Sequence, residues 1–129
     1  MYIGVMRDWS LTANANTLLK ENYMKVRELI ENLDNLKSNS VDDGLKYRWI
    51  GDVEGRVRCE IHGEDAEKLS IRISEEDELL IPDAYAGVYT FYLLAMLEYA
   101  EGNTSAYESM KKDYETALKS YAKYFIRNR

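Results

Sequence analysis

The sequence has little of what most catalytic and metal-binding sites need. Its 129 residues include one cysteine, Cys59, and one histidine, His62. A single cysteine cannot form a disulfide within the chain, and this pair would need distant carboxylates to complete a metal site. The sequence also contains no glycine-rich phosphate loop and no nucleophile next to a general base. We therefore expect a protein that is not an enzyme and that uses no cofactor.

Long apolar runs are also missing. The uncharged stretch at residues 84–97, fourteen residues between Asp83 and Glu98, is shorter than the roughly 18 to 20 residues that cross a bilayer. It is expected to form a buried helix, with no membrane partner. The opening residues MYIGVMRDWSLTAN lack the basic and apolar regions of a signal peptide, so the chain is expected to stay where it is made.

Charge is distributed unevenly along the chain. The formal net charge is −6 and the isoelectric point is about 4.9. Residues 64–83 carry eight acids and two bases, whereas residues 105–129 carry six bases and three acids. These regions are either two solvated faces or surfaces that attract each other between copies of the chain. Tight DNA binding is not expected from so acidic a protein, because it requires a concentrated basic surface.

Apolar residues recur every three or four positions in four segments, which predicts a mainly α fold with four helices. The first helix covers residues 17–37, and the second begins after Asp42 as N-cap. Pro82 suits the first turn of the third helix. Gly102 ends that helix in a left-handed conformation, and a capping box from Ser105 to Glu108 begins the fourth. The last two helices are expected to form an antiparallel hairpin over residues 82–127.

These periodic positions are expected to form the core. They are Leu19, Tyr23, Val26, Ile30, Leu33, Leu36, Leu45, Trp49, Val53, Val57, Ile61, Tyr85, Val88, Tyr89, Phe91, Tyr92, Leu94, Ala95, Met96, Leu97, Tyr99, Tyr107, Met110, Tyr114, Leu118, Tyr121 and Phe125. Tyrosine outnumbers phenylalanine by eleven to two. Such a composition fits either a thin core with many wet edges or an interface with another protein.

The chain is predicted to comprise an N-terminal arm, residues 1–16, and a single helical domain, residues 17–129. Between the second and third helices, residues 64–81 are expected to be extended. Leu69, Ile71 and Ile73 alternate there with polar residues, as in a half-buried strand. The sequence offers no obvious second strand. The segment is therefore either an extended loop or a strand that pairs with another subunit.

Three stretches together resemble a known family. They are KYRWIGDVEGRV (46–57), DELLIPDAYAGVYTFYLLAMLEYAEGN (77–103) and YESMKKDYETALKSYAKYF (107–125). Their order and spacing are similar to those of the head–tail connector proteins of tailed phages and prophages, the adaptors that bind beneath the portal. The residues that carry the resemblance are Lys46, Trp49, Ile50, Gly55, Asp77, Glu78, Leu79, Leu80, Pro82, Tyr85, Tyr89, Tyr92, Leu93, Ala95, Met96, Gly102, Tyr107 and Tyr114. The sequence departs from the family at Val53 and Glu54, where the family often has Leu-Asp.

The resemblance implies a four-helix, adaptor-like domain and a structural role in the neck of the virion. Many copies, with twelve the expected number, would form a ring attached to the portal protein. The ring would also meet the next neck, stopper or tail protein, and DNA would pass through its lumen without specific binding. The protein would be made in the cytoplasm of the bacterial host. All the residues that carry the resemblance are packing or turn residues, so it implies no catalytic centre.

Two surfaces are predicted for these contacts. The portal is expected to bind the aromatic and basic C-terminal residues, which are Tyr121, Tyr124, Phe125, Ile126, Arg127 and Arg129. Neighbouring subunits are expected to meet through Leu69, Ile71, Ile73, Glu75, Glu76, Asp77, Lys119 and Lys123. Two alternatives stay open from the sequence alone. One is a non-viral helical adaptor or regulator that binds a partner helix, and the other is a small enzyme whose site is assembled from distant carboxylates.

Overall fold

The structure is a computed structural model that describes residues 22–68 and 72–129. These parts contain four α-helices, α2 (Val26–Leu36), α3 (Asp43–Arg56), α4 (Gly87–Ala100) and α5 (Thr104–Asn128). One π-helical turn, η1 (Val57–Ile61), continues α3, and two 3-10 turns are η2 (Ala66–Lys68) and η3 (Asp83–Tyr85). The predicted mainly α fold is confirmed. The predicted arm at residues 1–16, together with Leu19, Leu69 and Ile71, lies outside the described residues.

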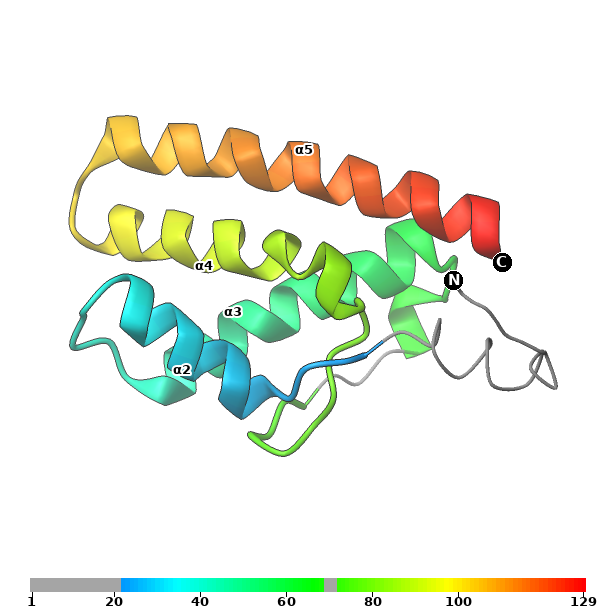
Figure 1. Cartoon of the computed structure of the whole chain (residues 1–129), viewed down its shortest axis with the longest axis horizontal. Coiled ribbons are helices and arrows are strands. Elements are labelled where there is room, and N and C mark those ends of the chain that lie inside the picture. The colour runs from blue at the N-terminus through cyan, green and yellow to red at the C-terminus, as the bar shows by residue number, and fades with distance from the viewer. Residues whose placement is uncertain (1–21, 69–71) are drawn as a thin grey trace, which may run out of the picture.

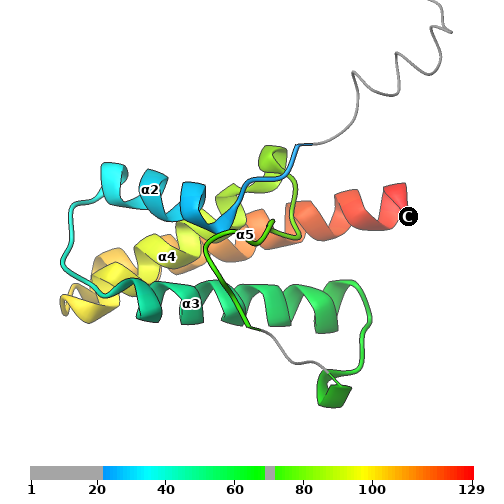
Figure 2. The same ribbon diagram turned by 90° about the horizontal axis from the view of Figure 1, so that it is seen from below.

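Helix α4 lies at the centre of the fold. It runs antiparallel beside α5 on one side (Figure 1) and contacts α2 and α3 on the other. In Figure 2 α2 and α3 lie apart, with α4 seen between them. Because neighbours cover it from several directions, α4 is apolar on most of its faces, as its sequence predicts. Its buried residues are Val88, Tyr89, Leu93, Ala95 and Leu97. Within the described ranges, no helix is both long and apolar enough to cross a membrane.

The turn between α4 and α5 is closed by a Schellman motif. Gly102 has a φ of 80°, and the N–H groups of Asn103 and Gly102 donate to the carbonyls of Glu98 (3.0 Å) and Tyr99 (3.1 Å). The predicted left-handed stop is confirmed. The predicted capping box at Ser105 is wrong, because this motif places Asn103 at the N-cap and α5 already begins at Thr104.

The tyrosines of α5 face the core at the predicted seven-residue interval. Tyr114, Leu118 and Tyr121 are buried, and Tyr107 and Phe125 are half-buried. Rings pair between the two helices, with Tyr92 and Tyr114 centroids 4.9 Å apart. The centre of this helix pair is therefore held together largely by aromatic packing.

An arginine ties α3 to α5. The Arg56 guanidinium donates to both carboxylate oxygens of Glu115, at 2.9 and 3.3 Å, and to the Tyr114 hydroxyl at 3.3 Å. Although partial burial opposes it, the Glu115 carboxylate raises the pKa of Arg56 further above its ordinary value. This bidentate pair fixes the angle at which α5 crosses α3.

The first helix starts later than its sequence pattern predicts. Residues 22–24 are irregular and Lys25 is extended, so α2 begins at Val26. Val26, Ile30 and Leu33 are buried as expected. Leu36 is wrong as a core position because it is 65% exposed at the last residue of the helix. Leu29, which the pattern did not select, is a core residue and is 2% exposed.

The segment before α2 pairs with the acidic loop after residue 72. The N–H groups of Val26 and Arg27 donate to the carbonyls of Asp77 and Glu75, each at 2.9 Å. Two further bonds run from Leu79 N–H to Met24 O and from Asp83 N–H to Asn22 O, also at 2.9 Å. The extended loop therefore has a partner within its own chain, which the sequence did not reveal. Within the described parts, the pairing amounts to one isolated bridge, between Lys25 and Glu78, and no strand.

Helix α3 follows its sequence prediction at the start and along its centre. The Asp42 carboxylate accepts from the Gly44 N–H at 2.8 Å, which confirms the predicted N-cap. Trp49, Val53 and Val57 are buried, whereas Leu45 is 40% exposed. The periodicity therefore predicted the buried residues at the centre of the helix correctly, but was wrong to place Leu45, in the first turn, in the core.

A buried carboxylate joins α3, α4 and the chain between them. Glu54 is 4% exposed and accepts from the Tyr89 hydroxyl at 2.5 Å and from the Leu80 N–H at 2.9 Å. The Tyr89 hydroxyl in turn accepts from the Ile81 N–H at 3.0 Å. The backbone of residues 80–81 is thereby held against the core. Pro82 is the next residue. The sequence predicted it in the first turn of a helix, but it lies just before η3.

Burial raises the pKa of the Glu54 carboxyl above its ordinary value, even though hydrogen bonds from Tyr89 and Leu80 oppose the shift. A raised carboxyl pKa adds stability below the unfolded value of about 4.3, and this stability is lost as pH rises through the folded value. We expect the stability of the natural protein relative to Glu54→Gln to be greater at pH 4.5 than at pH 7.5. Urea unfolding of both proteins at each pH measures this difference in the free energy of unfolding. An equal difference at the two pH values would contradict the prediction.

Candidate binding surface

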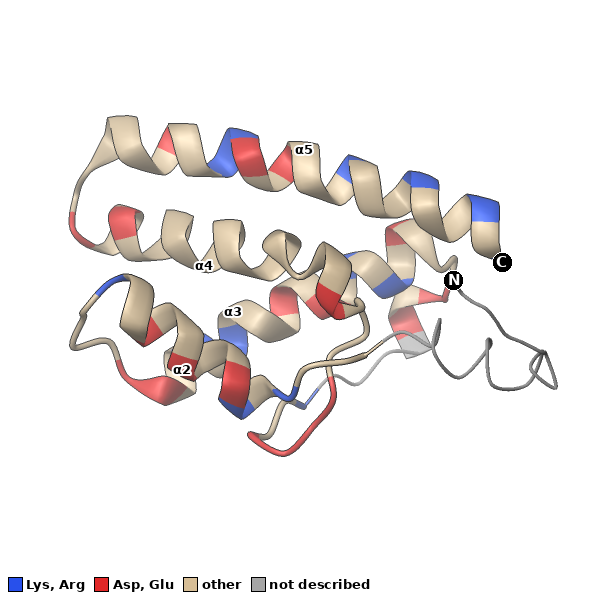
Figure 3. Ribbon diagram, in the orientation of Figure 1, with Lys and Arg blue, Asp and Glu red and all other residues tan. Residues whose placement is uncertain are grey.

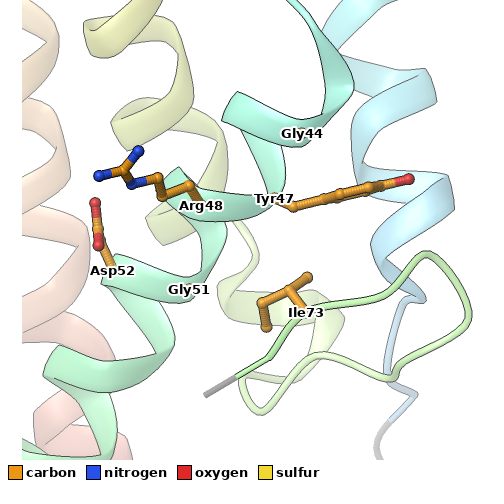
Figure 4. Close-up of a pocket in the computed structure, with 6 residues that line it drawn as sticks. All are labelled: Gly44, Tyr47, Arg48, Gly51, Asp52 and Ile73. Atoms are coloured by element: carbon orange, nitrogen blue, oxygen red, sulfur yellow. The ribbon is translucent and has the colours of Figure 1, made fainter. Parts of the chain in front are cut away.

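The structure has two hollows of interest. The larger, about 460 Å³, lies on the outer face of α3 and is lined by Gly44, Tyr47, Arg48, Gly51, Asp52 and Ile73. In Figure 4 the Arg48 and Asp52 side chains lie together, while Tyr47 points toward the other end of the hollow. Gly44 and Gly51 have no side chains to fill this hollow. Its lining includes no nucleophile with a neighbouring base.

The second hollow, about 250 Å³, lies at the C-terminal end of α5. It is lined by Tyr23, His62, Leu80, Pro82, Tyr121, Tyr124, Phe125 and Asn128, and we call it the aromatic hollow. Its walls come from four parts of the sequence, which are the segment before α2, the residue after η1, the chain before η3 and the last turns of α5. The Glu54 and Tyr89 hydrogen bonds to residues 80–81 support one of these walls.

His62 forms one wall because the π-helical turn ends there. Its N–H donates to the Val57 carbonyl at 2.9 Å, and Gly63 then reverses the chain with a φ of 77°. The imidazole stacks on Phe125 with ring centroids 4.3 Å apart, and its Nε2 shares a hydrogen bond of 2.9 Å with the Tyr121 hydroxyl. Burial lowers the pKa of His62, so the ring is neutral at pH 7.

Two tyrosines that line the hollow, Tyr121 and Tyr124, also contact a third tyrosine behind them. The Tyr85 ring on η3 lies 4.8 Å from Tyr124 and 5.9 Å from Tyr121, measured between centroids. Tilted and edge-on contacts of this kind are favourable for aromatic pairs. The cluster holds the last turns of α5 in place, so the aromatic hollow is a preformed feature of the folded domain.

The residues predicted to bind the portal divide into two groups. Tyr121 is 2% exposed, and Tyr124 and Phe125 are half-buried, so these three build the walls of the hollow. Ile126 is 59% exposed, and Arg127 and Arg129 are also exposed. The three exposed residues form the surface beside the hollow. Portal binding itself stays a prediction.

The residues predicted to join subunits lie at two edges of the molecule. Lys119 and Lys123 are exposed on α5, whereas the acidic loop lies at the opposite edge (Figure 3). Within the loop Glu76 pairs with Lys25 and Arg27, each at 3.1 Å. Of its other members, Ile73 is half-buried against the core, Asp77 accepts from Ser74 N–H at 2.9 Å, and Glu75 is exposed. Their role between subunits stays a prediction.

Sequence reasoning missed four parts of the aromatic hollow, namely His62, Leu80, Pro82 and Asn128. The tyrosine interval on α5 identified Tyr121, but the other walls come from segments far away in sequence. No periodic signal connects a residue after a π-turn with a proline twenty positions later. The pairing of His62 with Cys59 as metal ligands has no support, since the described residues contain no group of three or more metal-binding side chains.

Comparisons with known proteins do not narrow the possibilities. No protein family, curated protein or solved structure matches this chain.

Proposed function

We propose that this protein is a structural, non-catalytic head–tail connector of a tailed phage or prophage. Many copies, expected to be twelve, would form a ring beneath the portal protein in the virion neck. The ring would contact the next neck, stopper or tail protein on its other side. The observation that best supports this proposal is the C-terminal end of α5. There, exposed Ile126, Arg127 and Arg129 stand beside a preformed aromatic hollow.

The charge distribution supports contacts between copies. Lys119, Lys123, Arg127 and Arg129 form no ion pair with another described residue, and the acidic loop lies at the opposite edge of the molecule from α5 (Figure 3). Complementary patches on different faces of one molecule make head-to-tail contacts, and these close into a ring when the rotation permits. The overall charge of −6 favours a lumen that lets DNA pass, because it does not attract phosphates.

The proposal predicts binding to the portal of the same phage. When purified protein is mixed with purified portal rings and sedimented, we expect about one copy to travel with each portal subunit. The double variant Arg127→Glu with Arg129→Glu should weaken the association by tenfold or more, since two reversed charges are worth about 1.4 kcal/mol or more at a contact surface. These exposed residues are better targets than a deletion from Tyr124 onward, which would also remove the ring contacts of Tyr124 and Phe125 with Tyr85 and His62.

The matched control carries the same charge change on the same helix. Lys111→Glu with Lys112→Glu lies near the start of α5 and should leave the co-sedimentation unchanged. Circular dichroism should show equal helical content for all three proteins. Failure of the natural protein to sediment with portal rings at low salt, where charged contacts are strongest, would reject the connector proposal.

A non-viral helical adaptor is the second candidate, and the aromatic hollow is the observation that favours it. Such a protein would use the hollow to hold a segment of a regulatory partner. It would form a dimer or a one-to-one complex and no large ring. Analytical ultracentrifugation of the protein, alone and with portal, distinguishes the two candidates by mass.

A further inference from the structure

We propose that the aromatic hollow binds a short, extended, acidic segment of a partner protein, with one large apolar side chain of the segment inserted in the hollow. Acids on either side of that anchor would meet Arg127 and Arg129. The inference deepens the proposed function and rests on it in one respect, since the portal is then the protein that supplies the segment. The binding chemistry itself follows from the hollow.

The size of the hollow favours a single side chain as its occupant. Its volume is about 250 Å³, whereas pockets that enclose cofactors and drug-sized molecules usually measure about 300 to 1,000 Å³. The lining contains no Lys, Arg, Asp or Glu, and His62 is neutral at pH 7 because burial lowers its pKa. An uncharged aromatic wall gains most from an apolar or aromatic side chain that leaves water.

The charges beside the hollow favour acids next to that anchor. Arg127 follows Tyr124 by three residues on α5, and positions three apart are neighbours on a helix surface. Arg129 directly follows Asn128, the last residue of α5 and part of the lining of the hollow. Both arginines therefore lie next in sequence or in helical spacing to residues that line the hollow. Asp83 is exposed and directly follows Pro82, which lines the hollow, so it disfavours acids near Pro82. The acidic residues of the bound segment are therefore expected to lie along α5.

Single-stranded nucleic acid is the main competing occupant, since bases also stack on aromatic rings beside basic groups. The observations favour the peptide. Two arginines at one helix end provide few phosphate contacts, and the protein as a whole is acidic, with an isoelectric point of about 4.9. A strand that extended beyond the hollow would be repelled by the rest of the surface.

The test uses the full chain and a fluorescein-labelled peptide, Gly-Asp-Glu-Phe-Asp-Glu-Gly, followed by fluorescence anisotropy. We expect a dissociation constant on the order of 100 μM at low salt, which is typical of one anchor with a few surface charges. Replacing the peptide's phenylalanine with glycine should weaken binding by about tenfold. The protein variants Asn128→Trp, which fills the hollow from its exposed edge, and Arg127→Glu with Arg129→Glu should each weaken it by a similar factor.

Lys111→Glu with Lys112→Glu serves as the charge control and should bind the peptide like the natural protein. The proposal is overturned if the natural protein does not bind the peptide, or if the glycine peptide or Asn128→Trp binds equally well. Tighter binding of an oligothymidine than of the peptide would assign the hollow to nucleic acid and would also overturn it.

The portal assay separates this inference from the proposed function. If the peptide binds but portal rings do not, the hollow has the proposed chemistry and the connector function is rejected. If portal rings bind equally to Asn128→Trp and to the natural protein, the connector function stands and the hollow has no part in portal binding, which overturns the inference for that partner.

Discussion

Replacing Glu54 with alanine is expected to lower the free energy of unfolding by about 3 kcal/mol. The carboxylate accepts from the Tyr89 hydroxyl and the Leu80 N–H inside the core. Both donors would be left unsatisfied where water cannot easily reach them, and each such loss costs about 1 to 3 kcal/mol. The measurement is urea unfolding at pH 7, followed by circular dichroism at 222 nm.

The control for this variant is Glu31→Ala, on the exposed face of α2, which should change stability by less than about 0.5 kcal/mol. The loss of stability for Glu54→Gln should lie between those for Glu54→Ala and Glu31→Ala, because an amide oxygen still accepts one of the hydrogen bonds. A loss below about 1 kcal/mol for Glu54→Ala would mean that water or a rearranged Tyr89 satisfies the donors. The carboxylate would then not be what holds the wall of the aromatic hollow.

Leu93→Ala is expected to cost about 3 kcal/mol of stability. Leu93 is fully buried on α4, the helix that contacts α2, α3 and α5. Truncation of a buried leucine removes its transfer free energy and leaves a cavity, and the measured cost of such changes is typically 2 to 5 kcal/mol. Thermal and urea unfolding of the variant measure the loss.

The same substitution at an exposed leucine is the matched control. Leu36→Ala removes the same atoms from a side chain that is 65% exposed at the end of α2. We expect a change within about 0.5 kcal/mol. Equal losses at Leu36 and Leu93 would contradict the burial pattern, and would instead support the sequence prediction that Leu36 belongs to the core.

Local signals in the sequence predicted the helices well. Periodic apolar residues placed the centres of α3, α4 and α5, and Gly102 marked the end of α4. Asp42 was recognised as an N-cap because its carboxylate needs only the N–H of Gly44, two residues away. These features depend on interactions within a few residues, so the sequence carries enough information to identify them.

The errors occurred where distant segments decide the structure. The periodic pattern before α2 predicts more helix, but residues 22–27 pair with the loop at residues 75–83. Leu36 continues the apolar stripe of α2, yet it is 65% exposed among the residues that the structure describes. Ser105 to Glu108 has the letters of a capping box, but the Schellman turn had already positioned Asn103 to begin α5. In each case a non-local or preceding interaction outweighs a local preference.

The candidate site was predictable only in part. The aromatic and basic composition after residue 120 identified the end of α5, and the structure divides those residues into walls and an exposed edge. The other walls, His62 and Pro82, are held against α5 by the π-turn and by the hydrogen bonds that surround Glu54. A buried glutamate with a tyrosine partner thirty-five residues away has no sequence signature.

The pairing between the segment before α2 and the acidic loop also sets an order of assembly. A bridge from Lys25 to Glu78 closes a loop whose entropy costs about 3.5 kcal/mol. The four backbone hydrogen bonds across the pairing return about 1 kcal/mol each. The two terms nearly cancel, so the pairing gains little by itself and forms only when α3 and α4 already hold its ends together. We therefore expect folding to begin with α4 and α5, which are neighbours in sequence and make the most contacts with each other, and the extended segments to join last.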